Sequence, residues 1–266
     1  DVSESRGLGD VYKRQPRKCS EDSWTCHPHL LMAPVEMVRA PLDDMNVARA
    51  VVGGVVDYSD ATQTMDRLRK QRIEDSVADT ILFLQHPEVV TMGPRARKEG
   101  AKADGYRTVD VDRGGGMTWH GPGQLVIYPI IKWLENERGV PQIVSKMEHW
   151  VISALADCGV TGVRNDVMMG VWVDGYKICS VGLAFRNWVS KHGISINIET
   201  PGTRVEDLDC CGLSAGTTTS LHKLGHTHDL EGRFIDRDRI MEAMIQTSEE
   251  AISRVLSPPL SWRDVS

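Results

Sequence analysis

The sequence has few cysteines, no excess of positive charge, no long apolar run and no phosphate-loop signature. Six cysteines in 266 residues are too few for a disulfide scaffold, and they favour reduced thiols in a cytoplasmic setting. No stretch approaches the roughly 18 consecutive apolar residues of a membrane-spanning helix. The net charge of −6 argues against a protein that coats nucleic acid. We therefore expect neither a membrane protein nor a nucleic-acid-binding protein.

The chain is long enough to bury one substantial core, and 41% of its residues are hydrophobic. Its first ~30 residues show no helix or strand periodicity and no apolar segment of a secretory signal. We expect residues 1–33 to be a disordered or non-native leader, residues 34–257 a single domain and residues 258–266 a tail. The cysteines and histidines of the leader have no common zinc spacing, so no metal is expected; they are Cys19, Cys26, His27 and His29.

Helical and strand patterns alternate along the chain. The sequence predicts a helix capped by Ser59 or Asp60, a second over Gln142–Cys158 that Gly159 stops, and a third over Asp236–Leu256. The predicted strands are Ala78–Gln85, Val89–Met92, Gln124–Ile131, Gly170–Val173, Ile178–Arg186 and Gly193–Ile198. Several pairs of consecutive predicted strands are separated by too few residues for a helical crossover. The expected fold is α/β (α+β), a mixed sheet with antiparallel parts, flanked by helices.

The most unusual segment is Arg113–Gln124, RGGGMTWHGPGQ, in which five of twelve residues are glycine. Consecutive glycines let the backbone turn tightly and let a ligand approach the main-chain N–H groups. The chain has no Gly-Lys-Ser/Thr, and the segment leads into a strand rather than a helix, so it fits neither a phosphate loop nor a dinucleotide fingerprint. An acyl carbonyl or an adenylate are both possible ligands.

A lysine and a cysteine 34 residues apart are candidate catalytic residues. Lys177 lies at the head of an apolar strand, and Cys211 lies in a polar loop beside Gly212. A thiolate is the nucleophilic form of cysteine, and a neighbouring ammonium lowers the pKa of a thiol. If the two side chains meet in a cleft, they form a competent pair for acyl transfer.

Five segments in sequence resemble the lipoyl(octanoyl) transferase family, which is related to lipoate and biotin protein ligases. The resemblance runs from about Asp79 to Leu221 and includes the lysine-to-cysteine spacing. The segments are Gln85–Gly93, Arg113–Ile130, Gly170–Gly182, His192–Ile198 and Cys211–Leu221. The chain departs from the family pattern at Cys210, where a proline is usual, at Trp119, where a tyrosine is usual, and at Cys179, where a small apolar residue is usual.

The resemblance implies a ligase-like mixed sheet and a cytoplasmic acyltransferase without cofactor or metal. Cys211 would carry the octanoyl group as a thioester, and Lys177 would lower its pKa and relay protons. The donor would be octanoyl-acyl carrier protein; the acceptors would be lipoyl domains of 2-oxoacid dehydrogenases and the glycine cleavage H protein. The residues that would bind substrate are Arg113, Gly114, Gly115, Gly116, Met117, Thr118, Trp119, His120, Ser180, Val181, Gly182, Gly193, Ile194 and Ser195.

Both partner proteins tend to be acidic in this family, so a local basic patch would have to overcome the negative charge of this chain. The sequence offers one cluster of basic residues, in which only Glu99 opposes them: Arg95, Arg97, Lys98 and Lys102.

Three other functions compete with the transferase. An ATP-dependent lipoate or biotin ligase shares the fold but needs no nucleophilic cysteine. A serine hydrolase is suggested by Gly212–Gly216, which matches G-x-S-x-G but has no helical pattern after it. A catalytically inactive acyl-binding module would keep the pocket without the chemistry.

Overall fold

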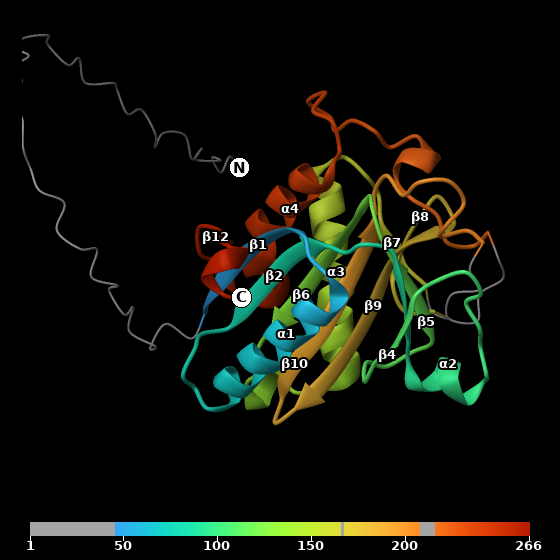
Figure 1. Cartoon of the computed structure of the whole chain (residues 1–266). Coiled ribbons are helices and arrows are strands. Elements are labelled where there is room, and N and C mark those ends of the chain that lie inside the picture. Colours follow the sequence, from blue (N-terminus) through green and yellow to red (C-terminus); the bar gives the residue numbers. More distant parts are fainter. Residues whose placement is uncertain (1–45, 166–167, 208–215) are drawn as a thin grey trace, which may run out of the picture. The chain divides into compact units, whose positions relative to one another are not determined.

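The computed structural model describes residues 46–165, 168–207 and 216–266 (Figure 1). The expected leader and the two adjacent cysteines, Cys210 and Cys211, lie outside the described residues. Two sheets form the framework. The larger runs in the order β11-β1-β2-β6-β10-β9-β8-β7, with β12 also paired to β1, and the smaller in the order β4-β3-β5.

The larger sheet is mixed, as the sequence predicts. β1 pairs in parallel with β2, β11 and β12, and the remaining ladders are antiparallel. Its strands are β1 (Val47–Val55), β2 (Thr80–Gln85), β6 (Gln124–Ile130), β7 (Val163–Arg164), β8 (Val171–Val173), β9 (Tyr176–Arg186), β10 (Val189–Asn197), β11 (Val255–Leu256) and β12 (Leu260–Ser261). The smaller sheet contains β3 (Val89–Met92), β4 (Thr108–Asp110) and β5 (Met117–His120).

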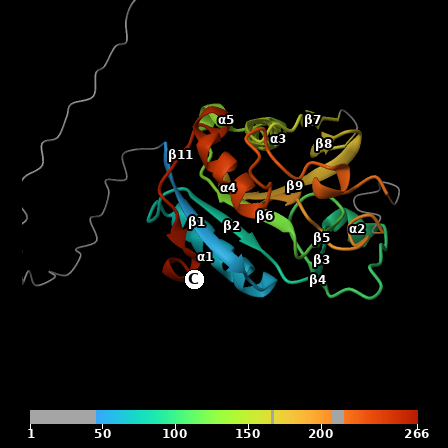
Figure 2. The ribbon, with the colours of Figure 1, turned by 90° about the horizontal axis from the view of Figure 1, so that it is seen from above.

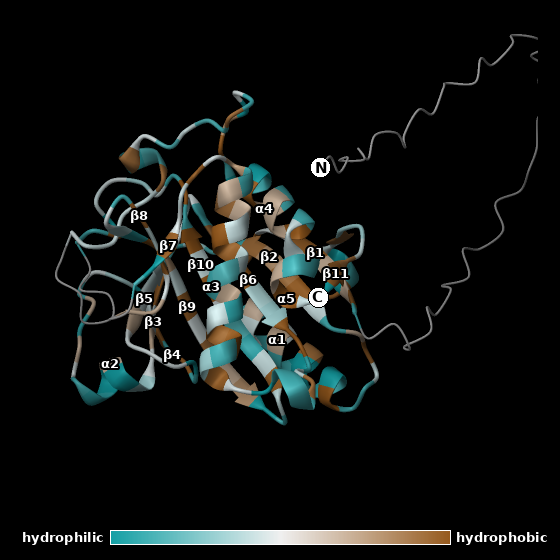
Figure 3. Ribbon diagram, turned by 180° about the vertical axis from the view of Figure 1, so that it is seen from behind, coloured by the Kyte–Doolittle hydropathy of each residue, from teal (hydrophilic) through white to brown (hydrophobic). Residues whose placement is uncertain are grey.

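Helices cover both faces of the larger sheet. Helices α3 (Val140–Asp157), α4 (Arg237–Gln246) and α5 (Ser248–Ile252) lie on one face, and α1 (Tyr58–Ile73) lies on the other (Figure 2). α2 (Pro94–Lys98) lies against β3 of the smaller sheet, and its residues are largely hydrophilic (Figure 3). The short 3-10 turns are Glu135–Glu137, His222–Leu224 and Trp262–Asp264. Among the described residues, no helix has the length and apolar character to cross a bilayer.

The two-faced burial follows from the alternation of side chains along each strand. Phe83 and Ile127 join the core cluster beneath α3 and α4, whereas Leu82 and Val126 join the cluster beneath α1. Every residue of β6 is buried, which explains its continuous apolar sequence. These two apolar layers pack β6 and β10 from both sides, so the residues of these strands are held in place by contacts on each face.

The turn between β9 and β10 sets the register at the site. Asn187 and Trp188 both have positive φ, 50° and 57°, as a two-residue hairpin turn with the twist of its strands requires. This turn places Gly182 opposite Gly193 across the ladder. Two segments expected to bind substrate are therefore neighbours in space.

The structure corrects several of the predicted boundaries. The side chain of Asp57 accepts the Ser59 N–H, so α1 begins at Tyr58 and neither Ser59 nor Asp60 is the cap. The predicted single helix over Asp236–Leu256 is two helices, α4 and α5, and the prediction is wrong beyond Ile252. Thr247 ends α4, and Ser253, with φ at 57°, turns the chain so that it can enter β11. Within the predicted glycine loop, Met117–His120 is a strand, β5.

Candidate active site

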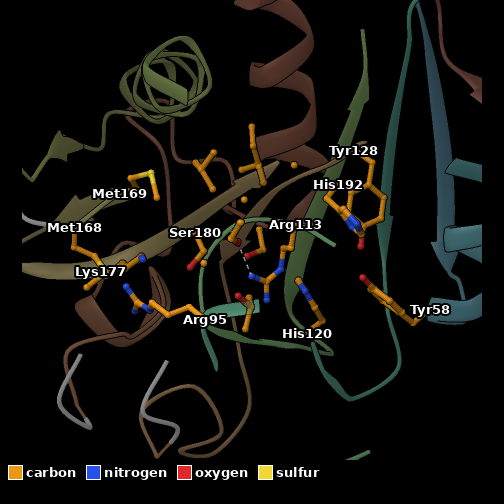
Figure 4. Close-up of a pocket in the computed structure, with 18 residues that line it drawn as sticks. Tyr58, Arg95, Arg113, His120, Tyr128, Met168, Met169, Lys177, Ser180 and His192 are labelled. Carbon is orange, nitrogen blue, oxygen red and sulfur yellow. Dashed lines mark hydrogen bonds between the residues drawn. The ribbon is translucent and has the colours of Figure 1, made fainter. Parts of the chain in front are cut away.

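A pocket opens between β9, β10 and the glycine-rich turn that precedes β5, and we call it the Lys177 pocket (Figure 4). Gly114 fastens the turn to the sheet, because its N–H donates to the carbonyl of Leu183 at 3.1 Å. Twelve of the residues predicted for the site line this pocket: Arg113, Gly114, Gly115, Thr118, His120, Lys177, Ser180, Val181, Gly182, Gly193, Ile194 and Ser195.

Four predicted site residues are not part of its lining. Met117 and Trp119 point into the core of the smaller sheet, and Trp119 donates its ring N–H to Glu88. Gly116 does not line the pocket, and its carbonyl accepts hydrogen bonds from the Arg113 guanidinium and from the backbone N–H of Gly93. Cys211 lies outside the described residues. Alternation along β5 explains the difference, because Thr118 and His120 face the pocket and their neighbours face away from it.

Arg113 holds the glycine-rich turn in shape. Its guanidinium donates to the carbonyls of Gly114 and Gly116, both at 3.0 Å. It also donates to the carbonyl and the hydroxyl of Thr91 on β3, at 3.1 and 2.7 Å. Its side chain is buried, so these bonds replace those it would make to water. One cation thus ties the turn to the smaller sheet and places positive charge beside the pocket.

Lys177 enters the pocket from the start of β9. The residue is only 3% exposed, and among the described residues its ammonium has no hydrogen-bonded or ion-paired partner. Gly170 makes room for it, because a Cβ there would lie 2.8 Å from Lys177 Cε and 2.1 Å from the carbonyl of Cys179. The Gly170 N–H is held by the buried carboxylate of Glu148 at 2.7 Å. An ammonium in these surroundings is available to a reacting group.

The backbone of Lys177 is also bonded to the segment that follows the undescribed residues 208–215. Its N–H donates to the carbonyl of Thr217 at 2.9 Å, and its carbonyl accepts from Thr219 at 3.0 Å. On the other side of the gap, the carbonyl of Glu206 accepts the N–H of Gly216 at 2.9 Å. The described ends of this loop therefore meet close to Lys177.

A chain of side-chain hydrogen bonds joins the glycine-rich turn to that segment. His120 Nδ1 lies 2.8 Å from Gln124 Oε1, Gln124 donates to Asn197 at 2.8 Å, and Asn197 donates to the carbonyl of Thr219 at 3.0 Å. Gln124 Nε2 bonds two acceptors, so its Oε1 must accept the proton on His120 Nδ1. Burial lowers the pKa of His120 well below its usual range. Neutral His120 therefore presents Nε2 as an acceptor, and it is not a donor to an oxyanion.

An aromatic cluster closes the far end of the pocket. Burial lowers the pKa of His86 to about 4 and raises that of Tyr58 to about 12 and that of Tyr128 well above its usual range. His86 Nδ1 donates to the carbonyl of Val56, so its Nε2 accepts from the hydroxyl of Tyr128 at 2.8 Å. These groups are neutral at pH 7. They therefore add no charge at this end of the pocket.

Sequence reasoning missed several lining residues: Tyr58, Arg95, Tyr128, Met168, Met169 and His192. Tyr128 lies inside a segment that carries the family resemblance, and alternation along β6 could have found it. Alternation gives no signal for His192, because four consecutive residues of β10, from His192 to Ser195, line the pocket. Tyr58 gives no local signal, because only the packing of α1 brings it to the pocket.

The described residues contain no group of three or more His, Cys, Asp or Glu side chains placed to hold a metal ion. The leader residues considered for zinc lie outside them. Part of the G-x-S-x-G match, residues 212–215, also lies outside. Thr218, just after the match, forms a β-bridge to Lys177, and no helix follows as a nucleophile elbow requires.

Comparison with known structures identifies the fold. A lipoate-protein ligase A bound with ATP superposes with a TM-score of 0.56 at 13% identity, covering 82% of this chain and 90% of that chain. A bipartite lipoate protein ligase with its E2 lipoyl domain from Thermoplasma acidophilum gives 0.55 at 12% identity, covering 82% and 89%. The predicted ligase-like mixed sheet is therefore confirmed.

Sequence comparison identifies the family. The family model of the lipoyl protein ligase A/B catalytic domain matches residues 57–248. An octanoyltransferase of Syntrophobacter fumaroxidans is 40% identical over 178 residues, 64% of this chain and 78% of that protein. An octanoyltransferase of Corynebacterium glutamicum is 33% identical over 236 residues, 86% and 88% of the two chains. The sequence relatives favour octanoyl transfer over ATP-dependent ligation, and the chain belongs to the octanoyltransferases of the lipoyl protein ligase A/B family.

Proposed function

We propose that the protein moves an octanoyl group from octanoyl-acyl carrier protein to the lysine of lipoyl domains, through a thioester on Cys211. The acceptors would be the lipoyl domains of 2-oxoacid dehydrogenases and the glycine cleavage H protein. The catalytic domain would span residues 34–257. A free Cys211 thiol requires reducing conditions, which makes the cytoplasm the proposed compartment.

The observation that carries this proposal is the buried ammonium of Lys177, which faces a pocket and has no hydrogen-bonded or ion-paired partner in the part of the chain that the structure describes. Thr217, six residues after Cys211, accepts a hydrogen bond from the backbone of Lys177. Six residues span at most about 20 Å, so this tether leaves Cys211 within reach of the pocket. A thiol beside an unpaired cation loses its proton more readily than a thiol in water.

The proposed reaction has two steps. The Cys211 thiolate attacks the carrier thioester, a new C–S bond forms, the C–S bond to the carrier breaks, and the carrier sulfur takes a proton from the Lys177 ammonium. The neutral ε-amine of the target lysine then attacks the acyl-enzyme, an amide forms, and Cys211 departs as thiolate while the amine proton passes to Lys177, which is now neutral and becomes an ammonium again. Thioester to amide is downhill, so no nucleotide is needed. Acyl transfer through the enzyme predicts ping-pong kinetics.

The acyl chain would lie in the Lys177 pocket along β9 and β10. Val181 and Ile194 supply apolar side chains, and Gly182 and Gly193 leave space where side chains would otherwise stand. Burying an eight-carbon chain contributes about 5 to 6 kcal/mol at ~0.8 kcal/mol per CH2. This contribution is large enough to select an acyl substrate over a short carboxylic acid.

The basic patch around α2, formed by Arg95, Arg97, Lys98 and Lys102, is the proposed docking surface for the acidic carrier protein. The contacts of these residues decide which of them can be changed in a test. Arg97 donates to the backbone carbonyls of Met92 and Val111 at 2.6 and 3.0 Å, so reversing its charge would disturb the smaller sheet. Lys98 and Lys102 are exposed. Lys98→Glu with Lys102→Glu should raise the KM for carrier protein severalfold and leave kcat unchanged; an unchanged KM rejects the patch.

Intact-mass analysis after mixing with octanoyl-acyl carrier protein tests the central proposal. We expect one octanoyl group per chain, removable by hydroxylamine and by apo lipoyl domain. Cys211→Ala should abolish this adduct, and the matched Cys210→Ala variant should retain it. An adduct that survives in Cys211→Ala overturns the assignment of the nucleophile. Octanoylation of the lipoyl domain from free octanoate and ATP would instead support a ligase.

A further inference from the structure

A second cleft lies behind the far end of the Lys177 pocket. It is lined by Thr62, Val109, Val111 and Asp112, among others, and opens on the side of α1 and the smaller sheet. Among the described residues, Tyr58 and His192 are the two that line both the pocket and this cleft. The partition between the two hollows is therefore a single layer of side chains.

Tyr58 is held firmly in this partition. It is the first residue of α1 and only 3% exposed, and it belongs to a small apolar cluster with Val89 and Val111. Its ring stacks on that of His120, with centroids 6.1 Å apart and planes 20° from parallel. The ring therefore stands across the pocket end and cannot turn aside without leaving its cluster.

His192 completes the partition in a strained backbone conformation. Its φ is 62°, in the left-handed region that few residues other than glycine adopt. Its Nε2 bonds Asp112 Oδ1 at 2.6 Å, although the Asp112 side chain is 54% exposed in the second cleft. Lys191 Nζ lies 3.7 Å from the same carboxylate oxygen. The hydrogen bond to Asp112 therefore fixes the orientation of the His192 ring, and strained residues of this kind are frequent at functional sites.

The two ends of the pocket have different chemistry. Figure 4 shows Lys177 at one end and Tyr58, Tyr128 and His192 at the other, with Arg113 and Ser180 between them. An acyl group bound at Lys177 that runs along the lining residues of β9 and β10 extends towards the partition. The tail of the chain must stop there.

We propose that Tyr58 and His192 form the wall that limits acyl chain length, and that Asp112 is the positioning residue that keeps His192 in it. This inference rests on the proposed function, because it takes the Lys177 pocket as the acyl site. In this proposal an octanoyl chain fits between Lys177 and the wall. A chain of twelve carbons meets the wall and would need the space of the second cleft, whose Val109 and Val111 offer apolar contacts.

The test is the acyl-chain preference of variants that open the wall, measured as kcat/KM for dodecanoyl- over octanoyl-carrier protein. Tyr58→Ala and His192→Gly should each raise this ratio by about tenfold or more, since each added CH2 that becomes buried favours binding. Glycine suits the positive φ of position 192, so His192→Gly removes the ring without new backbone strain. Asp112→Ala should raise the ratio by a smaller factor, because His192 remains but loses its anchor.

Two variants serve as matched controls. Tyr58→Phe keeps the ring in the wall, and Asp110→Asn changes only an exposed residue of the second cleft, so both should keep the parent ratio. The inference is overturned if the opened variants keep it too. If a variant no longer transfers an acyl group, the Kd for octanoate divided by the Kd for dodecanoate replaces the kinetic ratio. This Kd ratio should rise in the opened variants and stay at the parent value in the controls. If the parent itself transfers no octanoyl group to a lipoyl domain, the proposed function has failed, and the wall is then judged on these Kd ratios alone.

Discussion

At the scale of single residues, Arg113 shows how one side chain organises the site. Its guanidinium donates to two carbonyls of the glycine-rich turn and to both oxygens of Thr91. A lysine has one nitrogen on a flexible stem and cannot make this set of bonds. We predict that Arg113→Lys lowers stability by about 2 kcal/mol and kcat/KM at least about tenfold. Urea unfolding and acyl-transfer rates measure the two effects, and a variant with parent activity would show that the turn needs no such brace.

His86 predicts how stability depends on pH. Burial holds the pKa of His86 at about 4 in the folded protein, below the usual histidine value of about 6.5. The unfolded chain therefore binds the proton more readily, so stability is lost as pH falls below 6.5 and the loss is complete near pH 4. His86 alone should cost about 2 kcal/mol by pH 5. Urea unfolding at pH 7 and pH 5 should show a smaller loss in His86→Asn than in the parent.

The control for this prediction is His149, which is exposed on α3. His149→Asn should show the full loss of stability on acidification. Equal losses in both variants would mean that the pH dependence arises elsewhere, since burial also lowers the pKa of His120 and His192.

The sequence could reveal only part of the site at this scale. Arg113 and Lys177 were found because their sequence surroundings, a glycine run and a strand head, are unusual. Tyr58 and His192 were not found, because their roles depend on contacts between segments far apart in the chain. His192 pairs with Asp112 across 80 positions. Local patterns cannot contain such information.

At the scale of elements, the facing glycines of β9 and β10 have different tolerances. A Cβ on Gly193 would lie 2.2 Å from the carbonyl oxygen of Ile127, which is backbone and cannot move aside. A Cβ on Gly182 would lie 3.0 Å from Arg113 Cδ and 3.3 Å from the carbonyl oxygen of Gly114, so these neighbours need to move by only a few tenths of an ångström. We predict that Gly193→Ala lowers the free energy of unfolding by about 2 kcal/mol or more, and Gly182→Ala by less than about 1 kcal/mol.

Urea unfolding of the two variants measures this contrast. Gly182→Ala should nevertheless slow acyl transfer, because its methyl group displaces Arg113 and enters the pocket. Equal destabilisation by the two substitutions would contradict the argument that backbone contact at Gly193 decides the cost.

Elements were predictable where one pattern dominates. β3 has the predicted bounds, and α3 ends just before the glycine expected to stop it, because a buried apolar run and an amphipathic stripe are strong local signals. β1 was missed, since two glycines interrupt its apolar run and its pairing with β2 is the main support for an extended conformation. The third helix was predicted too long because the turn at Ser253 carries no glycine or proline.

At the scale of the whole molecule, buried ion pairs join segments that the chain keeps far apart. Arg254 is 2% exposed and bonds Asp79 at 2.8 Å and Glu137 at 3.0 Å. Asp79 also accepts from Arg72 at the end of α1 and from the backbone N–H of Lys132 after β6. One carboxylate thereby connects α1, β6 and the segment that leads into β11.

This arrangement predicts that Arg254 stabilises the entire framework on which the site rests. Arg254→Ala leaves Glu137 and Asp79 buried with fewer partners, and loss of one partner from a buried pair costs about 3 to 5 kcal/mol. The exposed Arg263, which has no ion pair among the described residues, is the matched control, and Arg263→Ala should change stability by less than about 0.5 kcal/mol. Urea unfolding at pH 7 measures both. If Arg254→Ala unfolds at the same urea concentration as Arg263→Ala, the desolvation of these charges cancels their attraction, and the apolar layers alone hold the molecule together.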